Sequence, residues 1–234
     1  MLLELDRKAE IELASHAGRV LRESLGKGPQ FIHVSIRRPF VVFYMRGLLS
    51  PTEKILLEQD QVFSVQHTRD LLMKTLIPEL KAYTSLIAGM NLQEFYYDWG
   101  LHNQSAVFVG IESDDGRYES LSGETFTGKQ ALEQEIAHIS QLVQKAPEGI
   151  YSCMLNERTL LVVRNGILIS IEKELIRLGY EGNLKIAKRN LEKQHLHNNG
   201  HFESMLKARV IDAYADWDFQ LDKSVIVFIL NPKP

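Results

Sequence analysis

Apolar positions follow a helical period at the start of the chain and a strand period soon afterwards. Residues 3–25 carry one apolar stripe at helical spacing, which predicts an amphipathic helix. The stretch GKGP (26–29) ends that helix, because Gly adopts left-handed conformations and Pro has no N–H to donate. The runs FIHVSIR (31–37) and FVVFYMR (40–46) then predict a β-hairpin.

The next segment begins with a helix-start signal. Ser50 is the expected cap, Pro51 occupies the first helical position, and Glu53 completes a capping box. We expect helix from there to about residue 90, with an interruption near 59–61 and a kink at Pro78. Two strands, 92–99 and 104–112, complete this half of the chain.

The second half repeats the first. GLLSPTEKILLE (47–58) returns as GILISIEKELIR (166–177), and Asp98-Trp99 returns as Asp216-Trp217. A spacing held at 119 to 118 residues predicts an internal duplication. The predicted helices of this half cover 128–145, 169–178 and 184–209, with a break at 198–200, and the predicted strands cover 150–157, 159–164, 210–219 and 223–230.

The order of elements predicts an α+β protein made of two tandem α-β-β-α-β-β units. The first covers residues 1–112, a polar linker covers 113–126, and the second covers 127–234. Each unit is expected to be an antiparallel sheet with helices on one face. Strands such as FVVFYM and VIVFIL are apolar on both faces. We therefore expect the units to pack together as a pseudo-twofold pair, a dimer fused into one chain, with further oligomerisation left open.

Composition narrows the class of protein. The chain has 234 residues, 44% of them hydrophobic, and a formal net charge of −3. Neither half is basic, which argues against nucleic acid as a partner. The single cysteine, Cys153, cannot form an intramolecular disulfide, and no signal peptide or membrane-spanning run is evident. We expect a cytoplasmic protein that is not itself membrane-spanning and has no cofactor.

Three stretches have candidate chemistry with a simpler alternative. Residues 123–130 approximate a phosphate-binding loop, but Gln130 replaces the magnesium-binding hydroxyl. We favour Thr127 as an N-cap with Gln130 in a capping box. His197 and His201 have the i, i+4 spacing of a zinc site, with His195 nearby, but Asn-Asn-Gly lies between them, so polar surface is favoured over metal. Cys153 is expected in the core.

A charged set recurs in both units and forms the main binding candidate. Its members are Glu53, Arg69 and Asp98 in the first unit, and Glu172, Arg189 and Asp216 at near-corresponding places in the second, with Lys188 next to Arg189. One interpretation is a capping carboxylate with ordinary surface ion pairs. The other is a polar cluster that fixes the helix on the sheet or contacts a partner. Glu172 is retained although Ser170 is out of register for a capping box, which weakens the purely capping interpretation.

The first unit resembles a bacterial family named after MpsC, a small component linked to a membrane-potential-generating, inorganic-carbon-supply system. The resemblance rests on GKGP with Lys27, the paired strands, residues 47–54, Arg69 and Asp98, and covers about residues 8–112. The second unit is similar to a diverged copy over about 128–231, with Ala146–Gly149 in place of GKGP. The resemblance implies an accessory protein near a membrane complex for sodium, proton or bicarbonate movement.

Together these features favour a non-enzymatic accessory or regulatory protein whose partner is a protein, such as a subunit of a membrane transport complex. The alternative is a small-ligand sensor or enzyme with its site between the two units, involving Glu53, Arg69 and Asp98.

Overall fold

A computed structural model describes residues 2–112 and 124–232 of the chain. Its internal contacts divide the chain into two units, Met1–Asp115 and Gly116–Pro234, and each unit is described by itself. Most of the linker expected at 113–126 lies outside the described residues. None of the described helices combines the length and the hydropathy needed to cross a bilayer.

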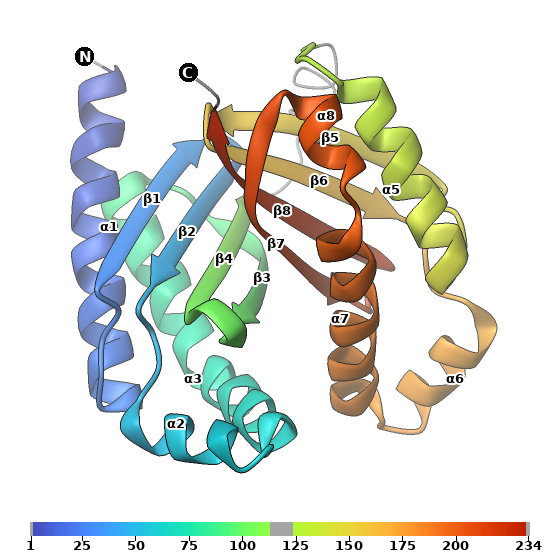
Figure 1. Cartoon of the computed structure of the whole chain (residues 1–234). Helices are drawn as coiled ribbons and strands as arrows, with labels where there is room; N and C mark the ends of the chain where they lie inside the picture. Colours follow the sequence, from blue (N-terminus) through green and yellow to red (C-terminus); the bar gives the residue numbers. More distant parts are fainter. Residues whose placement is uncertain (1, 113–123, 233–234) are drawn as a thin grey trace. The chain divides into compact units, whose positions relative to one another are not determined.

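The first unit has the predicted order of elements (Figure 1). The elements are α1 (Leu2–Leu25), β1 (Phe31–Arg37), β2 (Phe40–Arg46), α2 (Pro51–Glu58), α3 (Val62–Ala88), β3 (Leu92–Gly100), a short 3₁₀ turn η1 (Leu101–Asn103), and β4 (Ser105–Glu112). The expected interruption between α2 and α3 is confirmed, and α3 continues through Pro78.

The second unit has the same order with one change. Its elements are α5 (Lys129–Val143), β5 (Gly149–Asn156), β6 (Thr159–Asn165), α6 (Ser170–Arg177), α7 (Glu181–Asn198), α8 (His201–Leu206), β7 (Ala208–Asp218) and β8 (Lys223–Pro232). The helix that is continuous as α3 is divided here into α7 and α8, at the predicted Asn-Asn-Gly break. The last helix ends at Leu206, three residues before the predicted end.

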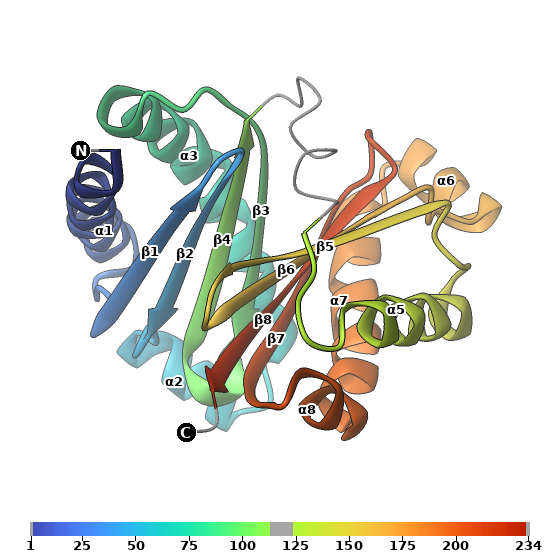
Figure 2. The ribbon, with the colours of Figure 1, turned by 90° about the horizontal axis from the view of Figure 1, so that it is seen from above.

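Both units contain a four-stranded antiparallel sheet of the same topology. The strand order is β1-β2-β4-β3 in the first and β5-β6-β8-β7 in the second. Seen from above, α1 and α3 lie on one face of the first sheet, and α5 and α7 on one face of the second (Figure 2). The apolar sides of these helices pack on the sheets, so each unit has its own hydrophobic core.

The duplication is also visible in the backbone. Residues with left-handed φ angles recur at the predicted spacing, in the pairs Gly47/Gly166, Asp60/Gly179, Gly89/Lys207 and Gln104/Asp222. The strand irregularity between Leu92 and Glu94 likewise returns between Val210 and Asp212. The side chains differ in three of the four pairs of left-handed residues, so the backbone path has been kept more closely than the residues that form it.

There is a steric reason why the repeated segment begins with glycine in both units. Gly47 has φ +69° and Gly166 has φ +64°. A Cβ atom would collide with the side chain of Gln30 at the first position and of Glu148 at the second. Both glycines therefore allow the chain to turn from a strand towards a helix in a conformation that other residues adopt rarely.

Candidate functional site

In the first unit the repeated segment begins α2 with a complete capping box. The Glu53 N–H donates to Ser50 Oγ at 3.3 Å, and the Ser50 N–H donates to Glu53 Oε2 at 2.8 Å. This confirms the predicted helix start. Glu53 is nevertheless buried, with 8% of its surface exposed, so a cap alone does not account for its environment.

Arg69 supplies the rest of that environment from α3. Its Nε donates to Glu53 Oε1 at 2.6 Å and its Nη2 to Glu53 Oε2 at 2.9 Å. The same Nη2 donates to the carbonyl of Leu48 at 2.8 Å, and the guanidinium lies 4.7 Å from the ring centroid of Trp99. Arg69 is fully buried. One side chain thus joins α2, α3, the loop after β2 and strand β3.

This contact also sets the protonation of Glu53. Burial by itself would raise the pKa of the carboxyl, but the hydrogen bonds and charge of Arg69 and the bonds to Ser50 outweigh it, so the pKa is lowered. Because the folded pKa lies below that of the unfolded chain, the ion pair contributes stability above the ordinary Glu pKa. That contribution is lost as the pH falls through the lowered value.

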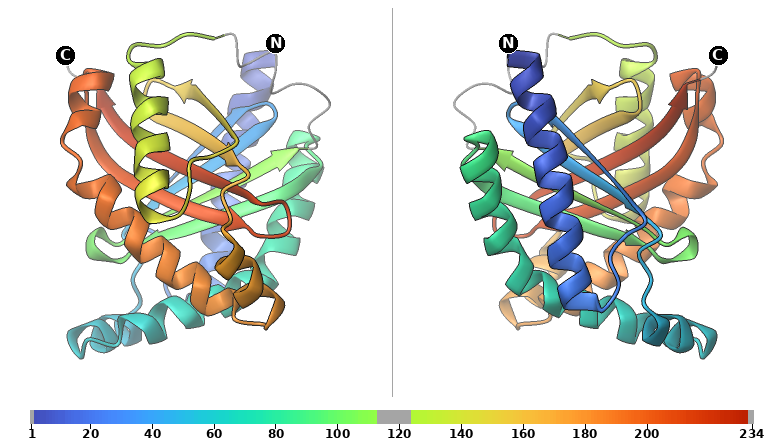
Figure 3. Two further views of the ribbon diagram at one scale, coloured as in Figure 1. Left: turned by 90° about the vertical axis from the view of Figure 1, so that its right-hand side faces the viewer. Right: turned by 90° about the vertical axis from the view of Figure 1, so that its left-hand side faces the viewer.

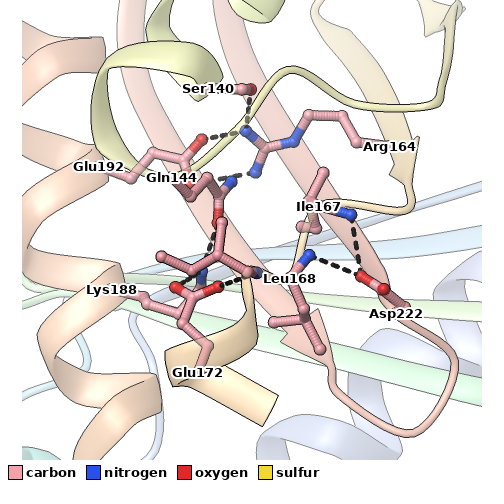
Figure 4. A network of polar contacts seen from close by, with 10 residues as sticks. Ser140, Gln144, Arg164, Ile167, Leu168, Glu172, Lys188, Glu192 and Asp222 are labelled. Atoms are coloured by element: carbon pink, nitrogen blue, oxygen red, sulfur yellow. Dashed lines mark hydrogen bonds and ion pairs between the residues drawn. The ribbon is translucent and has the colours of Figure 1, made fainter.

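The second unit has the same cluster in another chemical form (Figure 4). Lys188 on α7 contacts both Glu172 on α6 and the side-chain oxygen of Gln144, and its ammonium lies 5.4 Å from the Trp217 ring centroid. Glu172 Oε2 accepts a bond of 3.1 Å from the Ile169 N–H. Ile169, the N-cap, has no side-chain acceptor, so half of the capping box is retained. Burial lowers the pKa of Lys188, although Glu172 opposes this shift.

The predicted correspondence of Arg69 with Arg189 is wrong, because Lys188 makes the equivalent contacts. Arg189 instead pairs with Asp216 at 3.0 Å, and Lys185 reaches the same oxygen of Asp216 at 3.0 Å. In the first unit Asp98 is fully buried and accepts a 2.7 Å bond from the Trp99 N–H. The error arose because Lys188 and Arg189 are adjacent, and a one-residue choice turns a helix by about 100°.

Lys27, the remaining sequence candidate in the first unit, lies half-buried in the loop between α1 and β1. It takes no part in the contacts among Glu53, Arg69 and Leu48.

A carboxylate that the sequence did not single out holds the loop after β6. Asp222 Oδ1 accepts bonds of 2.8 Å from the N–H groups of both Ile167 and Leu168, and Asp222 Oδ2 lies 3.0 Å from Lys173 Nζ. Burial alone would raise the Asp222 pKa, but these bonds and Lys173 lower it. In the first unit the corresponding residue, Gln104, holds the loop through its backbone carbonyl and the Leu48 N–H at 2.9 Å.

A second buried ion pair was also missed. Arg164 on β6 pairs with Glu192 on α7, and both side chains are almost fully buried. Arg164 also donates to Ser140 at 2.7 Å (Figure 4). It donates to Ser224 on β8 at 2.8 Å as well. The one available signal was Arg164 itself, a charge at the end of the apolar run LLVV. Its partners lie 24 to 60 residues away in the chain and form no local pattern.

Of the other sequence candidates, Cys153 is confirmed as a buried residue and the expected Thr127 cap is wrong. Thr127 is not the cap of the following helix, because Gly128 holds that position with φ +83° and its Cα lies against the backbone of Met205, leaving no room for a Cβ. Lys129 donates to the carbonyl of Glu124 at 2.8 Å, within the stretch that approximates a phosphate loop.

The break between α7 and α8 separates His197 from His201, as expected, and both side chains are exposed. His197 Nε2 lies 3.4 Å from Asp212 Oδ1 on β7. His195 and His201 line a pocket together with His138 on α5.

The geometry suits a positioning role better than direct chemistry. Arg69 and Lys188 are each buried against a carboxylate and an aromatic ring at the corner between a short and a long helix. Each of these contacts joins the short helix of its corner to the long one. The carboxylates of Glu53 and Glu172 face these cations, whereas Arg69 Nη1 is buried without a hydrogen-bond partner among the described residues.

The fold and the paired clusters define a tandem α+β protein with one helix corner in each unit. The chain belongs to the MpsC family, described as "Na+-translocating membrane potential-generating system (MpsC)", whose family model matches residues 6–113 and again 128–232. No curated protein and no solved structure matches the chain. The double match agrees with the duplication seen in the strand order and in the left-handed residues.

Proposed function

We propose that the chain is a protein-binding accessory module, acting in the cytoplasm with a membrane system that moves ions or bicarbonate. The description of the family names a sodium-translocating, membrane-potential-generating system, and this supports the choice of partner. The buried charges in each unit hold a helix corner in place, and we propose that the corners, rather than the charges, meet the partner.

The observation that carries this proposal is the α2–α3 corner of the first unit. Ile55, Val62 and Phe63 are large apolar side chains there, and 41% to 55% of the surface of each is exposed. At the same corner Arg69, which is fully buried, joins α3 to α2 through Glu53. Exposed apolar side chains on a rigid support are typical of protein-binding surfaces.

The second unit repeats the arrangement with other residues. At the α6–α7 corner, Ile171, Leu178 and Tyr180 each have more than half of their surface exposed. Exposed apolar side chains therefore occur at the corresponding corner of both units, although at different positions of the repeat. Both corners are candidates for contact with a subunit of the membrane system.

Co-purification from membranes of the source organism tests the proposal. We expect the full chain to retain a subunit of an ion- or carbon-transport system, identified by mass spectrometry. Phe63→Glu and Ile55→Glu should weaken the association by about 2 kcal/mol each, roughly thirtyfold in Kd, because a charge would enter an apolar contact.

Leu86→Glu is the matched control, because Leu86 is 76% exposed near the other end of α3. The proposal fails if no transport subunit is retained, or if all three variants retain it equally well.

A further inference from the structure

A pocket with a volume of about 450 Å³ opens among α5, α7 and α8 of the second unit. The left view of Figure 3 shows α5 and α7 over one face of their sheet. The lining of the pocket includes three histidines, His138, His195 and His201, and the carboxylate of Glu135. Imidazole nitrogens and carboxylate oxygens are the side-chain ligands that zinc takes, besides thiolates. We propose that this pocket binds a divalent transition-metal ion of the zinc class.

The break between α7 and α8 brings two of the histidines together. In an unbroken helix, residues six apart are separated by about 120° around the axis, so His195 and His201 would face different directions. Asn199 instead adopts an extended conformation, with φ −88° and ψ 99°, and α8 starts afresh at His201. The same Asn-Asn-Gly sequence that interrupts a His197–His201 pair therefore leaves both His195 and His201 in the lining of one pocket.

Asn199 fixes this break to the wall of the pocket. Its side-chain nitrogen donates to Glu135 on α5, and its side-chain oxygen accepts a 2.9 Å bond from the His201 N–H. One residue thus connects the candidate ligand Glu135 with the backbone of the candidate ligand His201. Groups that orient the ligands in this way accompany most metal sites.

The residues at the corresponding positions of the first unit are different. Glu135 and His201 correspond to His16 and Tyr83, whose rings stack with centroids 3.6 Å apart. His138 corresponds to Arg19, which lies 2.9 Å from His16 Nδ1. In the second unit a carboxylate and two imidazoles stand where the first has this filled stack. The histidines of the pocket are therefore specific to the second unit.

The site requires movement of side chains. In the described part of the chain, the ligand atoms of these residues are not gathered within 4.8 Å of one another. His138 and His201 are exposed, and exposed side chains change rotamer within picoseconds to nanoseconds. The proposal therefore requires these imidazoles to rotate towards one another around the ion.

Isothermal titration of the untagged full chain with zinc chloride tests the proposal. We expect one zinc ion per chain. The double variant His138→Ala/His201→Ala should bind at least about tenfold more weakly, since even the loss of an outer residue that orients a ligand costs about 10–100-fold. His197→Ala, which alters a histidine held near Asp212, and His67→Ala, in the first unit, should bind as the unaltered chain does.

Thermal unfolding without zinc is the control for folding, and we expect no shift, because His138 and His201 are exposed. The proposal is overturned if the unaltered chain binds no zinc, if the double variant binds as well as the unaltered chain, or if His197→Ala removes binding. The outcome does not depend on the membrane partner, so it is separate from the proposed function.

Discussion

The same place in the core is apolar in the first unit and ionic in the second. Leu21, Met45, Met73 and Ala106 belong to the hydrophobic core of the first unit. At the repeat spacing they correspond to Ser140, Arg164, Glu192 and Ser224, which form the buried hydrogen-bonded network of the second. Figure 4 shows Arg164 between Ser140 and Glu192. The strand register agrees, because Met45 pairs with Ala106 and Arg164 pairs with Ser224.

This difference teaches that the backbone path does not require one kind of core. A buried ion pair must offset the cost of removing two charges from water, and apolar residues of similar volume often serve as well or better. The two units allow an apolar core and an ionic core of the same topology to be compared within one chain. The chain offers a convenient readout as well, since its two tryptophans are Trp99 in the first unit and Trp217 in the second.

The largest expected effect comes from breaking the ionic core. Arg164→Ala leaves Glu192 buried without its partner, and we expect the second unit to lose about 3–5 kcal/mol of stability. Urea unfolding followed by Trp217 fluorescence in a Trp99→Phe background measures this loss. A loss below about 1 kcal/mol would show that the ion pair is not buried as described.

A smaller effect is expected from exchanging the two forms of the corner cluster. Arg69→Lys gives the first unit the residue of the second, but a lysine cannot reproduce the forked contact with Glu53 and the Leu48 carbonyl. We expect a loss of about 1.5–3 kcal/mol, the usual contribution of a hydrogen bond to a charged group. Trp99 fluorescence in a Trp217→Phe background reports it.

Leu25→Gln should restore part of that loss. In the second unit Lys188 bonds to Gln144, whereas the corresponding residue of the first unit is Leu25, which has no side-chain oxygen. We expect the double variant Arg69→Lys/Leu25→Gln to recover about 1 kcal/mol relative to Arg69→Lys. Purely additive effects would contradict the equivalence of the two clusters.

The stability cost of replacing the serine at the helix start should differ between the two units by about 1 kcal/mol. Ser50→Ala removes a side-chain cap from α2, with an expected cost of about 0.5–2 kcal/mol. Ser170→Ala changes an exposed residue inside α6, and we expect an effect within about 0.5 kcal/mol. Equal costs in urea unfolding would mean that the cap of α2 is not specific to the first unit.

The smallest expected effect is a pH dependence at His16. Burial, with a contribution from Arg19, lowers the His16 pKa, while Glu79 and Glu23 act in the other direction. The unfolded chain then binds the proton more readily, so stability falls as the pH drops below the ordinary His value of about 6.5. His16→Phe should flatten this slope by less than the about 1.4 kcal/mol per pH unit that one proton contributes. Tyr83→Phe, which keeps the stacked ring, should leave it unchanged.

The sequence predicted the elements well because their signals are local. The capping box at Ser50, the break between α2 and α3, and the interruption at Asn-Asn-Gly all depend on neighbouring residues. The repeat of Gly47 and Glu53 at Gly166 and Glu172 gave the common topology. The packing of the two units against each other stays a prediction.

The clusters were less predictable because their members are far apart in the chain. Arg69 was identified, but Lys188 was passed over for its neighbour Arg189, since side-chain direction on a helix cannot be read from residue type. Gly128 replaced Thr127 as the cap because α8, more than 70 residues later, approaches it. A long-range contact overrode a local preference in each case.

The two units share one backbone path, and we expect the core residues of the first to be able to replace the corresponding core residues of the second. The most direct measurement is the free energy of unfolding of the second unit after Ser140→Leu, Arg164→Met, Glu192→Met and Ser224→Ala are made together. These changes install the residues of the first unit, and we predict a folded chain whose second unit is equally stable or up to about 1–4 kcal/mol more stable. A chain that does not fold, or a loss above about 3 kcal/mol, would contradict the claim.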